Sequence, residues 1–453
     1  MAILTSMVDS IDNLLDYLGS KSKQSISDYC DIETVDQDSV LVSKNGSLLS
    51  IISVDGVKKL MSSGNFYDDV VMRLHDGIQT SFGKKGHMLQ FWFQVDHDNT
   101  KKELQSILAP AKNTAKVLGM DMDDLFEERE NNLLDWTAAE NCYIVLWTLP
   151  DILSKSDLKR GNENAKKDKG KFNASTQNSQ NPLRGIVELR DTHNSFVTLF
   201  REFLSVSDIT SNILNVKEAV RDMRKSVDSE FTGENWEPSL PGDFIFPSVR
   251  KNAPAKEEFD ILWPKLGWQI CPRDAQIIDS NVVRIGDRIY SPMYMDLFQK
   301  NPEPFANLFS SLRSKRIPWR VSFLIEGDGL SSFGFKGMAA QLLGFASSQN
   351  KMISRGIDYL KGLKEIGDGE IVSTRAAFAT WAPKDQPQLL SKRASELARS
   401  VEGWGSCQVS EITGDPIAGV MSSALGVTQG NIGTKTAMPL EHALFMQDRK
   451  SVV

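Results

Sequence analysis

Two segments of this chain alternate apolar and polar residues in the manner of β-strands. In residues 87–95, the apolar positions of one face are Leu89, Phe91, Phe93 and Val95. In residues 319–327, the corresponding positions are Val321, Phe323 and Ile325. Successive side chains of a strand point to opposite faces of a sheet. This period of two therefore predicts two strands, each with one deeply buried face.

Each of these strands closes a longer pattern that occurs twice: a tight hairpin, then a helix, then the aromatic strand. The parts of the first copy are a hairpin over residues 40–54, a helix over 66–82 and the strand over 87–95. The parts of the second copy are a hairpin over 282–295 that turns at Gly286-Asp287, a helix opened by Asn301-Pro302, and the strand over 319–327. The Asn45-Gly46 dipeptide predicts a type I′ turn in the first hairpin, because both central residues of that turn need positive φ.

Further periodic segments follow each copy. After the first copy they are helices over residues 101–118 and 122–136 and an apolar strand over 142–149. After the second copy they are a helix over 337–363, a strand over 371–381, a helix over 386–401 and a strand over 407–412. This succession predicts an α+β fold of two related hairpin-helix-strand halves, of the split βαβ or ferredoxin-like kind. We expect additional helices, on one face of the sheet.

The length of 453 residues favours two or three units, and breaks in the pattern suggest their limits. The expected units are an N-terminal amphipathic helix (1–26), the first α+β half (27–150), a polar basic loop (151–189), a helical connector (190–270), the second α+β half (271–425) and a flexible tail (426–453). The N-terminal helix has apolar residues at helical spacing and an acidic polar face. It either packs on its own domain or serves as a docking arm for a partner.

Charge is spread unevenly over a chain whose net charge is −7. Residues 1–150 contain 13 basic and 23 acidic residues, a balance of −10, and such a surface repels nucleic acid. Residues 155–185 contain eight basic and three acidic residues, a balance of +5. Because this segment has little apolar surface to bury, we expect an unstructured loop. A nucleic-acid contact through this loop is the alternative.

The sequence favours a cytoplasmic protein. No apolar run approaches the roughly 18 residues that a membrane-spanning helix requires, and the acidic N-terminus lacks the pattern of a signal peptide. The four cysteines are far apart and have no CxxC pairing or neighbouring His cluster: Cys30, Cys142, Cys271 and Cys407. We therefore predict buried thiols, without a zinc site or a disulfide framework.

Residues 430–436 come closest to a phosphate-binding loop, since Gly430 and Gly433 precede Lys435 and Thr436. A P-loop needs glycine directly before the lysine and again six residues before it, so that backbone N–H groups surround the phosphates. Thr434 and Gln429 occupy those two places. The favoured interpretation is a flexible Gly/Thr linker, and nucleotide binding at Gly430 to Thr436 is the alternative.

The other candidate residues do not form a recognisable catalytic or metal-binding motif. The five histidines have no HExxH spacing, and we expect His87 and His97 at the surface, at the two ends of their strand. The acidic cluster over residues 121–130 lacks the glycine and the closing Glu of an EF-hand and indicates a solvated helix start. Glu411 and Asp415 follow a strand without a nucleophile nearby. We therefore predict no catalytic, cofactor-binding or metal-binding residue in this chain.

Three stretches carry a resemblance to a known family. Residues 27–34 (SDYCDIET), leading into the first hairpin, resemble the start of the IcmB/DotO and TraU ATPases of type IVB secretion and conjugation. Residues 371–381 (IVSTRAAFATW) and 411–416 (EITGDP) are similar to the portion that precedes the motor in the wider CagE/TrbE/VirB conjugation ATPase family. The resemblance covers nearly all of the chain.

In that family an assembly region precedes a RecA-like motor with Walker A and Walker B motifs, and this chain stops at Val453 before any such motif. The resemblance implies the front part alone, lacking the motor domain, so ATP and Mg²⁺ are expected only for the absent motor. It also implies a cytoplasmic protein at the inner face of the inner membrane. The implied partners are inner-membrane channel proteins, a partner secretion ATPase and further copies of the chain, as dimers that build a hexameric ring, without direct nucleic-acid binding.

Overall fold

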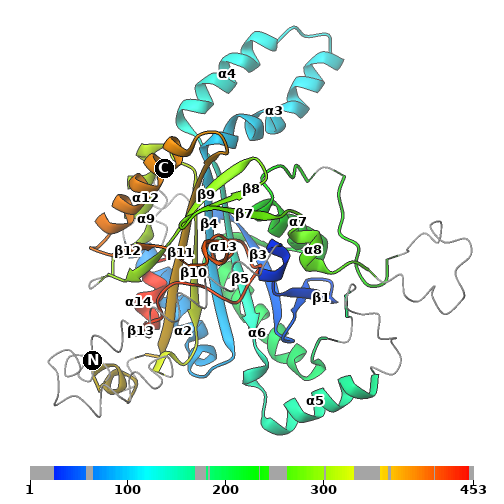
Figure 1. Ribbon diagram of the computed structural model, residues 1–453, viewed down its shortest axis with the longest axis vertical. Helices are drawn as coiled ribbons and strands as arrows, with labels where there is room; N and C mark the ends of the chain where they lie inside the picture. The colour runs from blue at the N-terminus through cyan, green and yellow to red at the C-terminus, as the bar shows by residue number, and fades with distance from the viewer. Residues whose placement is uncertain are drawn as a thin grey trace, which may run out of the picture.

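The computed structural model describes residues 25–57, 65–168, 180–181, 184–233, 235–243, 263–299, 302–330, 358–365, 369–412 and 414–447. It is a mixed α+β structure whose described strands form one large antiparallel sheet, with helices packed around it (Figure 1). The predicted N-terminal helix lies outside the described residues. The same holds for most of the helix predicted over 337–363; its end is described, and residues 358–365 are helical.

The first half of the sheet contains six strands. They are β1 (Ile32–Gln37), β2 (Val40–Ser43), β3 (Leu48–Val57), β4 (His87–Asp96), β5 (Ala139–Thr148) and β6 (Ile209–Ile213). Their order is β1-β2-β3-β5-β4, and β6 pairs with β3 beyond the short β2. The predicted hairpin and aromatic strand are therefore confirmed, whereas β1 and β6 were not foreseen.

The second half repeats this order. Its strands are β7 (Ala275–Asp279), β8 (Val282–Ile285), β9 (Arg288–Leu297), β10 (Trp319–Glu326), β11 (Ile371–Pro383) and β12 (Gln408–Glu411). They run β7-β8-β9-β11-β10, and β12 pairs with β9 as β6 pairs with β3. The halves join where the two aromatic strands pair antiparallel, with Phe91 opposite Phe323.

Helices cover both faces of the sheet, which corrects the expectation of helices on one face. One core lies under α2 (Asn65–Phe82), α6 (Val187–Val206), α9 (Phe305–Lys315), α12 (Pro387–Gly403) and α14 (Leu440–Phe445). The core on the other face lies under η1 (Ile26–Tyr29), α7 (Val216–Val227), α8 (Leu266–Ile270) and α13 (Pro416–Ser422). Strand β4 is accordingly buried on both sides, because Met88 and Trp92 belong to the second core.

The first hairpin turns differently from the predicted type I′ turn. Gly46 has φ +85°, but Asn45 is not among the residues with positive φ. Gly46 N donates to Ser43 O at 2.9 Å, and Ser43 N donates to Ser47 O at 2.9 Å. The connection is thus a three-residue loop with glycine in the left-handed position. Asn45 instead accepts a hydrogen bond from Ser47 N through its side chain, at 3.1 Å.

The basic segment after the first half is partly helical. Residues expected to form an unstructured loop build α5 (Lys155–Asp168), while 169–179 lie outside the described residues. Ion pairs at helical spacing accompany α5, including Arg160 with Asp157 at 2.9 Å. The prediction of a loop rested on the low apolar content of this segment. A polar sequence can nevertheless form a helix when ion pairs at i,i+3 and i,i+4 stabilise it, and here Arg160 also contacts Glu188 on α6.

The segment predicted as a flexible tail is packed against both halves as far as Gln447. It forms strand β13 (Thr436–Pro439), which pairs with β11, and α14, which packs on α2. At the other end of the segment, Asp31 Oδ2 accepts hydrogen bonds from Thr428 Oγ1 and Gln429 N, both at 2.8 Å. The prediction of a flexible tail rested on the glycine and threonine content. It was wrong because the residues that hold this segment in place lie far away in the sequence.

Replacing Asp31 with alanine is expected to loosen this connection. The change removes one carboxylate that accepts two hydrogen bonds, so the free energy of unfolding should fall by about 1–2 kcal/mol. Chemical denaturation measures the loss, and hydrogen exchange should show faster exchange around residues 428–430. Asp38→Ala, at an exposed side chain nearby, is the matched control. Equal exchange in both variants would contradict the anchoring role of Asp31.

Candidate interaction surface

Residues 430–436, the candidate phosphate loop, make hydrogen bonds and ion pairs within the chain. Lys435 Nζ lies 3.2 Å from Glu326 Oε2, and Thr434 Oγ1 donates to Asp296 Oδ1 at 2.8 Å. Gly433 N donates to Asn431 Oδ1 at 2.9 Å, and a Cβ at Gly433 would lie 2.9 Å from the carbonyl oxygen of Ala376. The glycine thus allows close packing on β11, and the lysine is paired with a carboxylate of β10.

The histidines of the described chain include one buried pair. His87, expected at the surface, is 5% exposed, because α6 covers it and Phe196 stacks on its ring at 4.1 Å. Thr148 Oγ1 lies 3.2 Å from Nδ1 of His87 and 2.9 Å from Nδ1 of His193. Nε2 of His193 lies 3.0 Å from Ser50 Oγ. Burial lowers the pKa of His87 to about 4 and that of His193 to about 3, so both rings are neutral at pH 7.

Two of the cysteines meet inside the protein. Cys30 ends η1 and Cys271 ends α8, at corresponding places before β1 and β7. Both thiols are buried in the same apolar core, and burial, followed by the neighbouring Cys30 thiol, raises the pKa of the Cys271 thiol. Within the described residues no group of three or more His, Cys, Asp or Glu side chains is arranged to hold a metal ion. This proximity could not be predicted, because the two cysteines are far apart in the sequence.

The two carboxylates singled out from the sequence, Glu411 at the end of β12 and Asp415 beyond it, bind other parts of the chain. Asp415 is buried, accepts from the Tyr29 hydroxyl at 2.9 Å and caps α13 by accepting from Ala418 N at 3.0 Å. Glu411 accepts from Asn281 Nδ2 at 2.7 Å. Asp415 therefore stabilises the junction between α13 and η1, which come from opposite ends of the chain.

A fully buried arginine lies at the centre of the sheet, where sequence reasoning had not placed a charge. Arg320 on β10 donates to Val420 O and Ser423 Oγ, at 2.8 and 2.9 Å, and to Ser226 O. The two carbonyls belong to the last turns of α13 and α7, where the helix dipole favours a cation. Burial lowers the pKa of Arg320 to about 10, so it stays charged at neutral pH.

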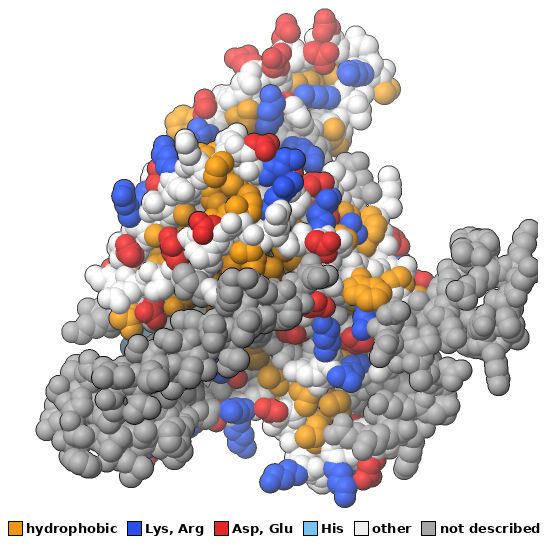
Figure 2. Space-filling view, viewed as in Figure 1, with side chains coloured by type: hydrophobic (Ala, Val, Ile, Leu, Met, Phe, Trp, Pro, Cys, Tyr) orange, Lys and Arg blue, Asp and Glu red, His pale blue; other side chains and the backbone are white. Residues whose placement is uncertain are grey.

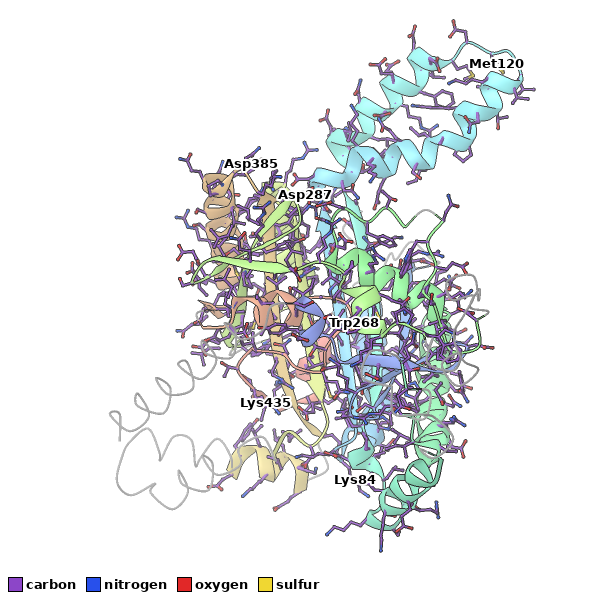
Figure 3. The ribbon with its side chains drawn as sticks, turned by 45° about the vertical axis from the view of Figure 1, so that its right-hand side comes forward. Lys84, Met120, Trp268, Asp287, Asp385 and Lys435 are labelled. Carbon is purple, nitrogen blue, oxygen red and sulfur yellow. The ribbon has the colours of Figure 1, made fainter. Side chains whose placement is uncertain are left out.

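A helical hairpin projects from the sheet between β4 and β5. It consists of α3 (Thr100–Val117) and α4 (Asp123–Trp136), and Met120 lies in the connection at its tip (Figures 1 and 3). The two helices pack mainly on each other through a short apolar seam, whose buried members are Leu104, Leu108, Ala115 and Phe126. The buried Glu130 adds polar contacts, accepting from Gln105 Nε2 at 2.8 Å and lying 3.5 Å from Lys112 Nζ.

The base of the hairpin is fixed to the body of the protein. Arg316 donates to Leu134 O, and its guanidinium lies 3.9 Å from Asp135. At the start of α3, Thr100 Oγ1 accepts from Ala139 N at 3.1 Å. Both helices are therefore held where they leave the sheet, and the hairpin is carried as a defined projection.

The outer surface of this hairpin is unusually apolar. Of the thirteen large apolar side chains that are exposed in the described part of the chain, six lie here: Ile107, Val117, Leu118, Met120, Leu125 and Trp136. Unpartnered apolar area of the described surface is therefore concentrated on one projection, a feature of protein interaction sites. The sequence carried a signal for this surface, since two large apolar residues, Val117 and Leu118, stand at the end of the expected helix.

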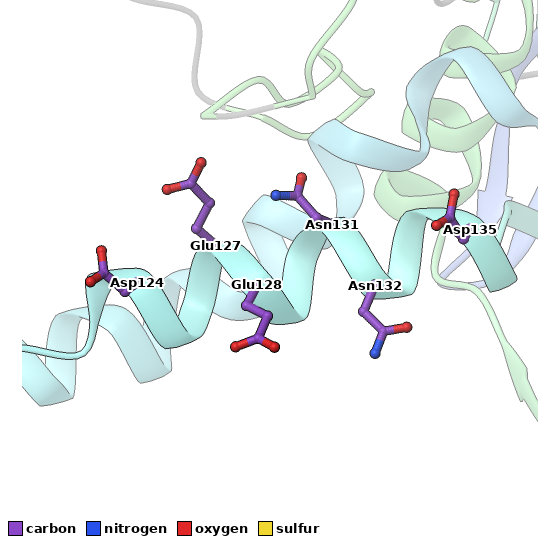
Figure 4. Close-up of a pocket in the computed structure, with 6 residues that line it drawn as sticks. All are labelled: Asp124, Glu127, Glu128, Asn131, Asn132 and Asp135. Atoms are coloured by element: carbon purple, nitrogen blue, oxygen red, sulfur yellow. The ribbon is translucent and has the colours of Figure 1, made fainter.

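An acidic face runs along α4 beside these apolar side chains. Asp124, Glu127, Glu128, Asn131, Asn132 and Asp135 line a shallow, open hollow on the solvent side of the helix (Figure 4). The helix start predicted for the acidic cluster is confirmed, because α4 begins at Asp123. The hairpin thus combines an apolar tip with a negatively charged flank, and we take it as the candidate interaction surface.

Two searches complete the description of the chain. None of the helices in the described ranges combines the length and the apolar character needed to cross a membrane. The chain matches no model of a known protein family, and a search among curated proteins finds no significant similarity. The conclusions about function therefore rest on the surface itself and on the resemblance of the sequence segments.

Proposed function

We propose that this chain corresponds to the assembly and docking region of a type IV secretion or conjugative transfer ATPase, the region that precedes the motor in that family. In this proposal it lies in the cytoplasm at the inner face of the inner membrane, associates with further copies of itself and attaches to channel proteins. The resemblance of residues 27–34, 371–381 and 411–416 supports this function. Residues 27–34 and 411–416 lie together in the structure, since Tyr29 donates to Asp415.

We propose further that each half is a split βαβ, ferredoxin-like unit extended by a hairpin strand pair. The strand orders β6-β3-β5-β4 and β12-β9-β11-β10 support this proposal, because both place the third strand of the unit between the first and the second. The helix following the first strand and the helix following the third pack on the same face in each half. Two such units side by side form a broad, stiff support for the projecting hairpin.

The α3–α4 hairpin is the observation that carries the docking function. Exposure of six large apolar side chains to water is unfavourable. Covering them with a partner makes binding more favourable by about 25 cal/mol per Å² of apolar area that is buried. The exposed residues near the tip also leave the internal seam untouched, because Leu104 and Phe126 face inward. The surface is thus available without unfolding of the hairpin.

Native mass and ATP hydrolysis measured on the same preparation test the proposal. We expect an oligomer whose mass falls on dilution and an ATPase rate that does not exceed the buffer blank. Changing Val117, Leu118 and Met120 together to serine should weaken association about tenfold, because interface energy concentrates in a few apolar anchors. The free energy of unfolding should change by less than about 0.5 kcal/mol per substitution, since all three side chains are exposed.

The control replaces exposed apolar residues outside the hairpin, Val187 and Val206 on α6, with serine. This variant should associate as the unaltered chain does. A monomer that hydrolyses ATP would overturn the proposed function. If the tip variant and the control variant weakened association equally, the hairpin would have no specific role in docking.

A further inference from the structure

The tip of the α3–α4 hairpin combines exposed apolar and acidic side chains. Residues 117–128 contain five acidic residues and no basic one, and a balance of −3 remains when the bordering Lys116 and Arg129 are included. Among the described residues, the ion pairs of the hairpin involve Glu130 and Asp135 instead. Figure 2 shows acidic side chains gathered at the outer end of this projection. The exposed apolar side chains of the same stretch are Val117, Leu118, Met120 and Leu125. A partner that fits this tip is therefore both apolar and cationic.

Residues 331–357, which lie outside the described residues, have a sequence of the complementary kind. They contain three basic residues, Lys336, Lys351 and Arg355, and no acidic residue. The helix predicted over 337–363 would place four large apolar residues in one row, with Lys351 and Arg355 off that row. The members of the row are Met338, Leu342, Phe345 and Met352. The chain thus contains a segment with the apolar and cationic character that the tip requires.

The residues on both sides of this segment are fixed at the end of the sheet opposite to the hairpin. Strands β10 and β4 are antiparallel, so the chain leaves β10 where β4 begins, whereas the hairpin starts where β4 ends. Beyond β10, Asp328 N donates to Phe82 O at 3.2 Å. After the segment, Lys364 Nζ donates to Gly83 O at 3.3 Å. Lys84, next to these two acceptors, and Met120 at the tip accordingly lie at opposite ends of the molecule (Figure 3).

The segment cannot reach the hairpin tip of its own chain. A stretch of 27 residues held on both sides extends at most about 45 Å from its attachment, half its length at roughly 3.4 Å per residue. Any helix within it shortens this reach. The tip lies farther away, because β4 spans about 30 Å and α3 adds about 27 Å beyond it. The tip is therefore open to the same segment of another copy.

We propose that residues 331–357 of one copy dock on the α3–α4 tip of a second copy. The inference rests on the proposed function and deepens it by naming the surfaces through which copies associate. Each copy has one tip and one such segment, attached at opposite ends, so the contact is head-to-tail and repeats from copy to copy. It produces a closed ring if the rotation between copies closes, and an open filament if it does not. Apolar contact supplies affinity, and opposite charge sets specificity and the rate of encounter.

Composition selects this segment over the others of more than ten residues that lie outside the described ranges. Residues 1–24 contain three aspartates against two lysines, so their charge has the sign of the tip. Residues 169–179 are basic, but Phe172 is their one large apolar residue. In residues 244–262, three acidic residues offset three basic ones. Among these segments, residues 331–357 alone combine an apolar row with positive charge and no acidic residue.

A photo-crosslink placed at the tip identifies the occupant directly. In the full chain, Met120 is replaced by p-benzoylphenylalanine, which on irradiation bonds to neighbouring C–H groups. An equal amount of isotope-labelled chain without this residue distinguishes crosslinks between copies from those within one copy. We expect the captured peptide, identified by mass spectrometry, to come from residues 331–357 of a labelled copy. The same reagent at Val187, which is exposed on α6, is the matched control and should not capture this segment.

Charge reversal tests the same contact through self-association, measured by sedimentation equilibrium. The tip-reversed variant carries Glu127→Lys and Glu128→Lys, and the segment-reversed variant carries Lys351→Glu and Arg355→Glu. Each variant alone opposes like charges at the contact, so its association should weaken about tenfold. In a one-to-one mixture, the reversed tip of one variant faces the reversed segment of the other, and the two unaltered surfaces also face each other. Association should therefore return on mixing.

The control for charge reversal carries Lys392→Glu and Arg399→Glu, at exposed sites on α12. It changes the net charge of the chain as much as the segment-reversed variant does, so any effect of net charge alone appears in both. Association of the control should equal that of the unaltered chain.

The possible outcomes separate this inference from the proposed function. If the chain associates but the crosslinks from position 120 fall outside residues 331–357, the inference is wrong and the assembly function stands. The same holds if mixing does not restore association. If segment reversal abolishes binding to phosphatidylglycerol vesicles and leaves association unchanged, the segment binds a membrane surface and the inference fails. A chain that is monomeric at every concentration overturns both.

Discussion

Replacing Arg320 with methionine is expected to lower the free energy of unfolding by about 3 kcal/mol or more. The guanidinium is fully buried and satisfies the last carbonyls of two helices, Ser226 O on α7 and Val420 O on α13, together with Ser423 Oγ. Methionine fills similar space but donates no hydrogen bond, so these acceptors stay buried and unpaired. Denaturation by urea, followed by circular dichroism, measures the loss.

Two further variants separate the charge from the geometry. Arg320→Lys keeps the cation but has a single ammonium in place of the planar fork, so it should recover only part of the stability. Arg201→Met, on the exposed face of α6, is the matched control and should stay within about 0.5 kcal/mol of the unaltered chain. An Arg320→Met protein as stable as this control would show that the carbonyls find other donors.

Acidification is expected to destabilise the protein steeply through His87 and His193. In the unfolded chain a histidine has a pKa near 6.5, whereas burial lowers the pKa to about 4 for His87 and about 3 for His193. Below pH 6.5 the unfolded state binds protons that the folded state excludes, so stability falls as the pH falls and levels off below the folded pKa values. Around pH 5 the slope should approach about 2.7 kcal/mol per pH unit, the value for two protons.

Unfolding free energies measured between pH 7 and 4.5 test this dependence. His193→Gln removes one titrating group while an amide still contacts Ser50 and Thr148, so the slope contributed by the pair should fall by about half. His442→Gln, at an exposed histidine, is the control and should leave the slope unchanged. An unaltered slope in His193→Gln would mean that other groups cause the acid sensitivity.

Local patterns were sufficient for the long elements of this fold. The alternation in residues 87–95 and 319–327 gave β4 and β10, and the helical periods gave α2, α3, α4 and α12 within a few residues. The strands and α2 and α12 bury apolar faces, and α3 and α4 keep a helical period although they bury only a short seam, so local sequence is enough to predict their structure. The two hairpins were also evident, because Gly46 and Gly286 supply the positive φ that their turns need.

The short elements could not be predicted, because their stability comes from distant partners. Strand β6 has apolar residues only at its ends and forms by pairing with β3, while β13 forms by pairing with β11. The C-terminal segment is rich in glycine and threonine, and its contacts are to distant residues such as Asp31 and to β11. Propensity within a window of ten residues contains no information on such contacts.

The candidate surface was visible in the sequence only in part. The acidic residues of α4 were recognised as solvated, but the sequence led to no prediction for the apolar residues between α3 and α4, and residues of this type are usually buried. Their exposure follows from topology: the hairpin leaves the sheet after β4 and returns at β5, so its tip finds no layer to pack against. The prediction for His87 was wrong in the opposite sense: it was expected at the surface, but α6 covers this end of the strand and buries it.

The hydrogen bonds from Thr428 and Gln429 to Asp31 can form only late in synthesis of the chain. Asp31 leaves the ribosome early, but its partners follow only after nearly four hundred further residues have been translated. Helix α13, which covers the second face of the sheet, arrives equally late. Until then the second face is covered only in part, by α7 and α8, and a chain released before Thr428 exposes apolar surface that chaperones recognise.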